Sequence, residues 1–372
     1  MRIQALLLAA AVAVAQKPVE FEQRQGLQLD SGKAELTVLT RGGAFVSMTL
    51  NEDAEKLNPM WNPVRAARET GGPQRFGDSI GHFVCVDGFG PISKEEAAAG
   101  LQGHGEAHRQ PWEIVSQGKL EVQFQAKLPL LHEMFRRKLQ MVEGEQVVYV
   151  DSELENLLAF DRPANWAEHG TIGSPFLATE RTVVDASVGQ CQTRPHNGQP
   201  PRRLASEKEF QYPNAPLLHG SLVNLRAVPA NPGSMDHTGC LMDPAREHVF
   251  VTALRVDKKL LFGYLFRRAE YPWLQEWMNY QKDGALARGL EFGTQPFDVS
   301  RRQTVEMGKL FGVPAFRWLP AKSKITTRFL MFLTRVPDGF TKVDDVRLSG
   351  GVLTIEDKAA GRTVKLAASL GL

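Results

Sequence analysis

The sequence has few cysteines, no long apolar run beyond its first residues and no clustered charge, and each shortage excludes a class of protein. Three cysteines in 372 residues exclude a disulfide-stapled fold and allow at most one bridge. Lysine and arginine number 44 against 42 acidic residues and do not form runs, so no nucleic-acid surface is predicted. No later apolar stretch approaches the roughly 20 residues of a membrane-spanning helix. The composition favours a soluble protein with a small, neutral partner.

The first sixteen residues, MRIQALLLAAAVAVAQ, have the layout of a secretory signal peptide. Arg2 precedes an apolar run from Ala5 to Ala15, which ends in the small-x-small sequence Ala13-Val14-Ala15. This run is too short to span a bilayer. We therefore expect residues 1–15 to be removed and the mature protein to be exported to the periplasm or secreted.

Helical periodicity is scarce as well. Apolar runs with a period of two dominate, as in AELTVLT and HVFVTALRV, and a hairpin is expected to turn at Glu143-Gly144-Glu145. The best short helix is SKEEAAAG, with Ser93 as its N-cap and Gly100 as its stop. Strands without intervening helices predict an all-β, antiparallel sandwich.

No break in composition marks a second large domain. We expect one β-sandwich domain over residues 16–345 and a C-terminal appendage of short strands over residues 346–372, joined through Gly350-Gly351 and Ala360-Gly361. The proline-rich segment 194–216 is predicted to be a long surface loop.

The three cysteines differ in their surroundings. Cys85 lies in the strand-like stretch HFVCVDGF and is expected to be buried. If a bridge exists, it therefore joins Cys191 to Cys240.

The stretch GLEFGTQPFD places a carboxylate, Glu291, between Leu290 and Phe292. A charged side chain is rarely buried without a partner, so an acid at such a place is either half exposed or held for chemistry. The chain then breaks at Gly293 and reaches another acid, Asp298.

The stretch GHGEAHRQPW holds a second polar cluster. His104, Glu106 and His108 alternate and would face one way on an extended chain, which makes a metal site conceivable. A loop of hydrogen-bonded histidines is the favoured reading, because no further cluster with ligand spacing occurs. A metal-free sugar site uses the same residues, with Arg109 as a fixed cation and Trp112 as a flat apolar face.

Two further stretches contribute candidates. In NWAEHGTIGSPFL, Trp166 and His169 precede a Gly-Ser-Pro turn, and in MDHTGCLMDP the chain offers Asp236 and His237. Taken alone, the histidine of the first stretch is more often structural, and the second stretch is more often a solvated turn. We include Trp166 among the sugar-binding candidates.

In their order along the chain, HGEAHR, EHGTIG, DHTGCL and LEFGTQPFD resemble the sparse motifs of the aldose 1-epimerase (galactose mutarotase-like) superfamily, over roughly residues 35 to 335. The resemblance implies a large twisted antiparallel β-supersandwich that interconverts sugar anomers. It also implies that Glu291 is the catalytic base and His169 the general acid. The residues implied to hold the sugar are His104, Arg109 and, more loosely, Asp236.

That chemistry needs a carboxylate and an imidazole on opposite sides of the sugar, and it uses neither metal nor nucleotide. Other functions stay open. One is a non-catalytic carbohydrate-binding protein of the same fold. Another is a glycoside hydrolase or lyase, in which hydrolysis would need Glu106 and Glu291 roughly 5–9.5 Å apart. A metal enzyme built on His104, Glu106 and His108 is the last.

Overall fold

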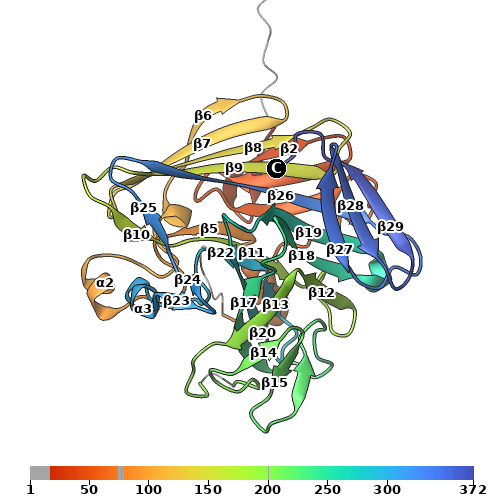
Figure 1. The fold of residues 1–372 in the computed structure, drawn as a ribbon. Helices are drawn as coiled ribbons and strands as arrows, with labels where there is room; N and C mark the ends of the chain where they lie inside the picture. The colour runs from red at the N-terminus through yellow and green to blue at the C-terminus, as the bar shows by residue number, and fades with distance from the viewer. Residues whose placement is uncertain (1–16, 74–76, 78, 200) are drawn as a thin grey trace, which may run out of the picture.

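Two large sheets lie face to face in a computed structural model that describes residues 17–73, 77, 79–199 and 201–372 (Figure 1). The expected signal peptide, residues 1–15, lies outside the described residues. Every strand pair within the two sheets is antiparallel, so the predicted all-β sandwich is confirmed. None of the described helices has the length and apolar character needed to cross a bilayer.

The first sheet has twelve strands. In spatial order they are β1 (Lys17–Phe21), β2 (Arg24–Asp30), β3 (Ala34–Leu39), β4 (Phe45–Leu50), β5 (His82–Val86), β11 (Trp166–Gly173), β21 (Leu286–Gly289), β20 (Trp273–Tyr280), β17 (Ser234–Met242), β13 (Val188–Thr193) and β14 (Glu209–Gln211). The short strand β22 (Glu291–Gly293) pairs with both β11 and β20.

The second sheet has eight strands. In spatial order they are β12 (Thr182–Ala186), β18 (His248–Arg255), β19 (Leu260–Arg267), β26 (Lys324–Arg335), β9 (Val147–Asn156), β8 (Glu133–Met141), β7 (Glu121–Leu128) and β6 (Glu113–Gln117). Strands β8 and β9 form the hairpin predicted at residues 143–145.

Smaller elements decorate the sandwich. The two-stranded ribbons are β10 (Arg162–Ala164) with β25 (Arg317–Leu319), β15 (Asn214–Pro216) with β16 (Leu222–Asn224), and β23 (Lys309–Leu310) with β24 (Val313–Pro314). The helices are α1 (Pro63–Thr70), α2 (Lys94–Ala98), α3 (Arg301–Met307) and the 3-10 turns η1 (Ala107–Arg109) and η2 (Val256–Lys258). Helix α2 begins at the predicted N-cap, Ser93, in a full capping box.

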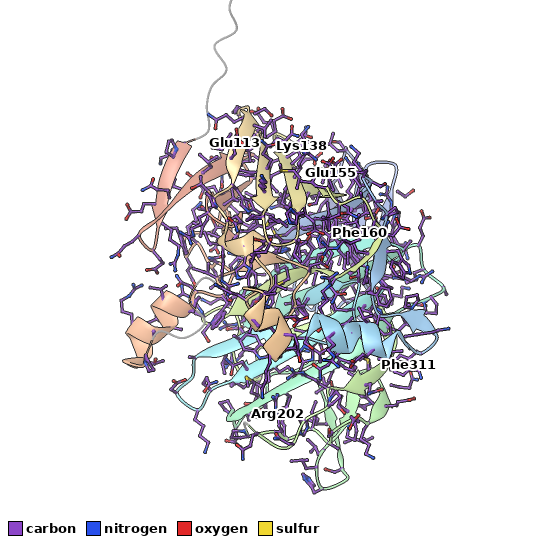
Figure 2. All side chains as sticks on the ribbon, turned by 90° about the vertical axis from the view of Figure 1, so that its left-hand side faces the viewer. Glu113, Lys138, Glu155, Phe160, Arg202 and Phe311 are labelled. Carbon is purple, nitrogen blue, oxygen red and sulfur yellow. A yellow bond between two sulfur atoms is a disulfide. The ribbon has the colours of Figure 1, made fainter. Side chains whose placement is uncertain are left out.

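The core lies between the sheets because the strands alternate apolar and polar residues. On β8, Phe135 and Leu139 are fully buried, whereas Arg136 and Lys138 point outward. Figure 2 labels Lys138 together with Glu155 on this outward face. Hydrophobic burial of this kind is the main driving force for folding.

A buried ion pair joins the two sheets through that core. Arg137 Nη2 of β8 donates to Glu168 Oε1 of β11 at 2.5 Å, and both side chains are fully buried. His82 Nε2 lies 2.9 Å from the other oxygen of Glu168, and Trp166 Nε1 donates to the first. Burial raises the pKa of Glu168, but the charge of Arg137 and the bond with His82 outweigh it and hold the pKa at about 2.

The C-terminal strands cover part of the second sheet. Strands β27 (Asp345–Ser349), β28 (Val352–Asp357) and β29 (Arg362–Ala367) form a sheet of three, with turns at the predicted glycines. Their apolar side chains and the outer faces of β18, β19 and β26 form a second core cluster. This explains why HVFVTALR is apolar on both faces, and why Val147 and Tyr149 at the start of β9 are buried as well, whereas β7 and β8 alternate throughout.

Segment 194–216 is less irregular than the sequence predicted. It contains β14 and β15, which lie at the bottom of the view in Figure 1. It also lies beside the disulfide between Cys191 and Cys240, which are paired opposite each other on β13 and β17. The predicted bridge is therefore present, and Cys85 is free and buried, as expected.

Candidate active site

His169 and Glu291 meet because their strands are neighbours in the first sheet. Strand β22 pairs with β11, with Glu168 opposite Phe292. Leu290 lies between β21 and β22 and keeps the register with β11, since its N–H donates to Gly170 O at 2.7 Å. His169 Nε2 then lies 3.3 Å from Glu291 Oε1.

The two side chains are therefore in contact, rather than on opposite sides of a ligand as the sequence led us to expect. Adjacent antiparallel strands hold their Cα atoms too close for a sugar to pass between the two groups. Glu291 is 1% exposed and His169 is 7% exposed. The other ring nitrogen of His169, Nδ1, lies 2.9 Å from Thr171 Oγ1, which fixes the orientation of the ring.

The pair opens into a cavity of about 340 Å³. That volume lies within the usual range for small-molecule sites. The polar side chains that line it include those of His104, His169, Glu291 and Asp298, and the larger apolar ones are those of Trp61, Met235 and Trp277. Converging titratable groups in an otherwise apolar pocket are the usual mark of a binding or active site.

Burial makes the pair favour its uncharged form. It raises the pKa of Glu291 well above the ordinary value, and the charges of Asp298 and Glu276 raise it further. It lowers the pKa of His169 well below the ordinary value, and His104 lowers it further. The free site therefore favours a protonated Glu291 beside a neutral His169.

His104 stands next to this pair, with its ring centroid 5.1 Å from that of His169. The backbone N–H of Gly90 donates to its Nδ1 at 3.3 Å, so Nε2 carries the proton of the neutral ring. Burial and the charge of Arg109 lower the pKa of His104 to about 4. His104 is thus a neutral N–H donor at physiological pH.

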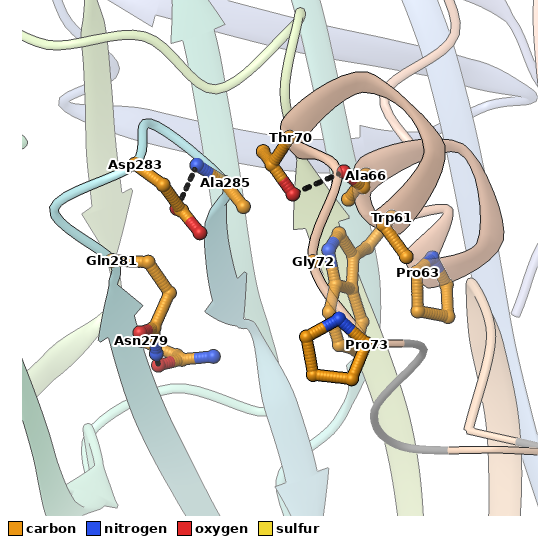
Figure 3. A pocket seen from close by; sticks show the side chains of 11 residues that line it. Trp61, Pro63, Ala66, Thr70, Gly72, Pro73, Asn279, Gln281, Asp283 and Ala285 are labelled. Atoms are coloured by element: carbon orange, nitrogen blue, oxygen red, sulfur yellow. Dashed lines mark hydrogen bonds between the residues drawn. The ribbon is translucent and has the colours of Figure 1, made fainter.

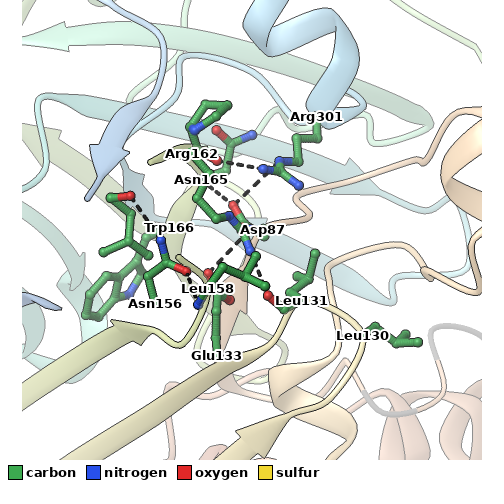
Figure 4. A network of polar contacts seen from close by, with 12 residues as sticks. Asp87, Leu130, Leu131, Glu133, Asn156, Leu158, Arg162, Asn165, Trp166 and Arg301 are labelled. Carbon is green, nitrogen blue, oxygen red and sulfur yellow. Dashed lines mark hydrogen bonds and ion pairs between the residues drawn. The ribbon is translucent and has the colours of Figure 1, made fainter. Parts of the chain in front are cut away.

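A buried polar network anchors the segment that carries His104 (Figure 4). Asp87, directly after β5, exchanges two 2.7 Å hydrogen bonds with the backbone of Asn165. Its carboxylate pairs with Arg162, and Arg301 Nε lies 3.8 Å away. These contacts fix the start of the segment that returns to the cavity at residues 90–91 and 103–104.

Asp298 is a second acid in the cavity, and no role was predicted for it although it ends the GLEFGTQPFD stretch. Arg194 Nε lies 2.7 Å from its Oδ1 and His237 Nε2 lies 3.3 Å from it. Burial raises the pKa of Asp298 to about 6, although Arg194 and Arg202 act to lower it. The signal for Asp298 was its place seven residues after Glu291, across the turn that ends the strand.

Trp61 lines two cavities. It lines the main cavity and also a smaller cavity of about 90 Å³, together with Asn279, Gln281 and Thr70 (Figure 3). Its ring centroid lies 5.7 Å from that of Trp277, at 69°. The two indoles give the main cavity a broad apolar surface, which the sequence did not single out.

Asp236 is the first correction to the predicted site. It is 1% exposed and is not among the residues that line the cavity. Its carboxylate accepts from the backbone N–H groups of Arg203 and Leu204 and from Arg203 Nε. The next residue on β17, His237, points to the opposite face, toward Asp298, because strand residues alternate.

Trp112 and Trp166 are also corrections, since neither lines the cavity. Trp112 packs on Phe124 and Phe135, and Trp166 packs on Phe135 and Tyr271, all within the core between the sheets. Flat aromatic residues are used for burial as well as for sugar stacking, and residue type alone does not separate the two.

Arg109 contributes to the site from outside the cavity. Its Nη1 donates to the carbonyl oxygens of Gly103 and Gly105, each at 2.8 Å, and it is not among the cavity-lining residues. Because those carbonyls flank His104, Arg109 positions the histidine.

The cluster of His104, Glu106 and His108 does not face one way, since the chain there is a turn followed by η1. Glu106 accepts from the backbone N–H groups of Leu130 and Leu131, so it is not the second acid of the cavity. Among the described residues, no group of three or more His, Cys, Asp or Glu side chains is placed to hold a metal ion.

Solved structures share this architecture at low sequence identity. A candidate aldose 1-epimerase from Klebsiella pneumoniae matches with a TM-score of 0.59 and 12% identity over 84% of this chain and 80% of that one. A galactose mutarotase related enzyme from Lactobacillus acidophilus matches with a TM-score of 0.56 and 12% identity over 85% and 100%. A galactose mutarotase-like protein from Clostridium acetobutylicum matches with a TM-score of 0.56 and 12% identity over 86% and 99%.

These similarities show the fold. The chain has the galactose mutarotase-like architecture that the resemblance of its motifs implied. No family model matches the sequence, and no curated protein matches it. The function is therefore argued from the site itself.

Proposed function

We propose that this protein is an aldose 1-epimerase-like enzyme that interconverts the anomers of a sugar by acid–base catalysis. The observation that carries the proposal is the 3.3 Å contact between His169 and Glu291 at the wall of a cavity of about 340 Å³. Such a pair offers one proton donor and one proton acceptor side by side.

The geometry fits a hemiacetal, in which the anomeric hydroxyl and the ring oxygen share one carbon. One member of the pair accepts the hydroxyl proton while the other gives its proton to the ring oxygen. The C1–ring oxygen bond breaks and the C1–hydroxyl bond becomes a carbonyl, so that C1 can present either face when the ring closes. The pair ends with the same number of protons, and closure on either face uses the reverse transfers.

The electrostatics of the pair suit this exchange. In the free site both groups are uncharged, and the two proton transfers convert them to a carboxylate and an imidazolium in contact, so the opposite charges that form in the buried site compensate each other. In the free site the donor is Glu291 and the acceptor His169, which reverses the roles that the resemblance implied. Since mutarotation runs both ways, either arrangement serves as the starting state.

The rest of the cavity supplies recognition. Neutral His104 offers an N–H to a sugar oxygen, and the carboxylate of Asp298 offers acceptor oxygens to hydroxyl groups. Trp61 and Trp277 give apolar surface for the C–H face of a pyranose.

The test is the rate of anomer exchange, measured by two-dimensional exchange NMR on several aldoses with the mature protein. Glu291→Gln and His169→Asn should each slow exchange by about 10²-fold or more, and their double variant should lose far less than the sum of both losses. Glu106→Gln is the matched control, because its carboxylate lies outside the cavity and should leave the rate per folded molecule unchanged. The proposed chemistry also predicts full activity after treatment with a chelator.

The same assay separates the other functions. Binding of an aldose without faster exchange would identify a carbohydrate-binding protein. Release of new reducing ends from a glycoside that depends on Glu291 would identify a hydrolase, with Asp298 in place of Glu106 as the second acid of the cavity. Loss of activity with a chelator, restored by a transition metal, would identify a metal enzyme.

A further inference from the structure

A separate cavity of about 330 Å³ lies where two strand turns meet η1. It is lined by residues of the β1–β2 turn and its following strand, of the β3–β4 turn and of η1, and none of its lining residues lines the main cavity. The side chains that matter here are Gln23, Arg24, Gln25, Thr40, Arg41 and His108.

His108 is the unexplained group in this cavity. It is 3% exposed, and neither ring nitrogen makes a hydrogen bond of acceptable geometry, although the ring approaches the backbone of His104. Leaving a buried polar group without a partner is unfavourable, because the group loses its hydrogen bonds to water. A ligand in the cavity would remove this cost.

The positive charge of the side chains that line this cavity favours an anionic ligand. Arg24 and Arg41 line the cavity, and no carboxylate does among the described residues. Among the described residues, Arg24 donates to the backbone carbonyls of Glu22 and Gly77. Two guanidinium groups repel a cation and bind oxyanions with paired N–H groups. The described lining residues also offer no aromatic ring on which a neutral sugar could stack, apart from the imidazole itself.

Backbone hydrogen bonds join two segments of the cavity wall. The β3–β4 turn is bonded to the segment after η1 through Gly42 N–H to Gln110 O and Trp112 N–H to Thr40 O, both at 2.9 Å. A Cβ atom on Gly42, which has a φ of +75°, would lie 2.0 Å from His108 O. This close approach places the backbone beside Arg41 directly against the backbone of His108.

We propose that this cavity is a binding site for a small oxyanion, of the phosphate or carboxylate type, held by Arg24, Arg41 and the ring N–H of His108. The volume exceeds that of inorganic phosphate, so a small organic phosphate or polycarboxylate also fits. The site does not depend on the proposed epimerase activity.

The experiment uses the mature protein and measures binding by calorimetry and by the rise in melting temperature with inorganic phosphate, sulfate, citrate and, as a monovalent control, chloride. Arg41→Gln should weaken the binding of the preferred oxyanion by about tenfold or more, because it removes a charge-assisted contact from an exposed side chain. Phosphate binding without citrate binding assigns the phosphate type, and the reverse result assigns the carboxylate type.

His108→Phe is the sharper variant, because it keeps a ring against Phe83 and removes both unpartnered nitrogens. Its melting temperature without ligand should stay the same or rise, whereas the rise caused by the oxyanion should shrink. Arg302→Gln is the matched control, since this exposed arginine pairs with Glu306 far from the lining, and it should bind as the wild type does. No binding of any oxyanion, or equal binding by all three variants, would overturn the proposal.

Discussion

The carboxylate of Glu291 occupies the space that a side chain at Gly289 would need, since a Cβ atom on Gly289 would lie 2.0 Å from Glu291 Oε1. The two residues lie on either side of Leu290 in an extended stretch and so on the same face, and the carboxylate lies over the glycine. The same oxygen is the one that faces His169. The glycine therefore provides the space in which the carboxylate contacts the imidazole.

We predict that Gly289→Ala slows anomer exchange by about 10²-fold or more while the protein still folds. The new methyl group must push the carboxylate away from His169, and overpacking at a buried site costs about 1–3 kcal/mol of unfolding free energy. Gly189→Ala is the control, because its Cβ would lie 3.7 Å from Gln211 Oε1, an ordinary contact. An alanine variant at position 289 with the wild-type exchange rate would show that the contact is not needed.

The sequence predicted part of this site for a physical reason. Acids and histidines in apolar strands are costly, so Glu291 and His169 stand out by residue type, and the structure places both with His104 at one cavity. Their catalytic roles stay predictions. The direct contact between them depends on which strands are neighbours, and that pairing joins segments far apart in the chain.

Asp236 matches a substrate-binding position of the motifs, but the structure places its side chain outside the cavity. We predict that Asp236→Asn lowers the free energy of unfolding by about 1–3 kcal/mol and leaves exchange per folded molecule nearly unchanged, because its carboxylate accepts three bonds from residues 203–204. Asp298→Asn should do the reverse and change sugar affinity or exchange more than stability. Denaturant unfolding and exchange NMR on the same preparations decide, and an Asp236→Asn protein of normal stability without activity would restore Asp236 to the site.

The pH profile follows from the protonation state of the free site, in which Glu291 is protonated and His169 is neutral. Burial lowers the pKa of His169, so this residue becomes protonated only below the ordinary histidine pKa of about 6.5. The rate of anomer exchange should therefore fall on the acid side only below that pH. It should fall on the alkaline side well above the ordinary value of a glutamate, because burial and then Asp298 raise the pKa of Glu291. Asp298→Asn removes one of these charges, so the alkaline limb should move to lower pH. A limb that does not move would argue that another group titrates there.

The buried pair of Glu168 and Arg137 makes a stability prediction. Glu168→Gln should cost about 3–5 kcal/mol of unfolding free energy, because it leaves a buried guanidinium without its charge partner, and adding Arg137→Met should recover part of the loss. The pKa of about 2 is below the unfolded value, so the contribution of Glu168 is fully present above about pH 4.3 and is lost as the pH falls toward 2. Glu153→Gln, in a partly exposed pair with Arg136, should cost less than about 1 kcal/mol.

The contact between Glu168 and Arg137 could not be predicted from the sequence. Strand periodicity, the hairpin at residues 143–145 and the cap at Ser93 are local, and the structure confirms them. Glu168 and Arg137 lie on different sheets, and each looks like an ordinary outward-facing charge in its own strand. Only the packing of the two sheets turns them into partners, together with the core positions of Trp112 and Trp166.

Export is the last prediction, and it concerns residues that the structure does not describe. We propose that residues 1–15 are removed on export, and the bond between Cys191 and Cys240 supports an oxidising destination, since such bonds persist outside the cytoplasm. The intact mass of the exported protein should begin at Gln16, with the loss of ammonia if that glutamine cyclises. Replacing Ala13 and Ala15 with lysine should leave an uncut precursor, because the cleavage site needs small residues at both positions. A wild-type protein that keeps Met1 and stays in the cytoplasmic fraction would contradict the proposal.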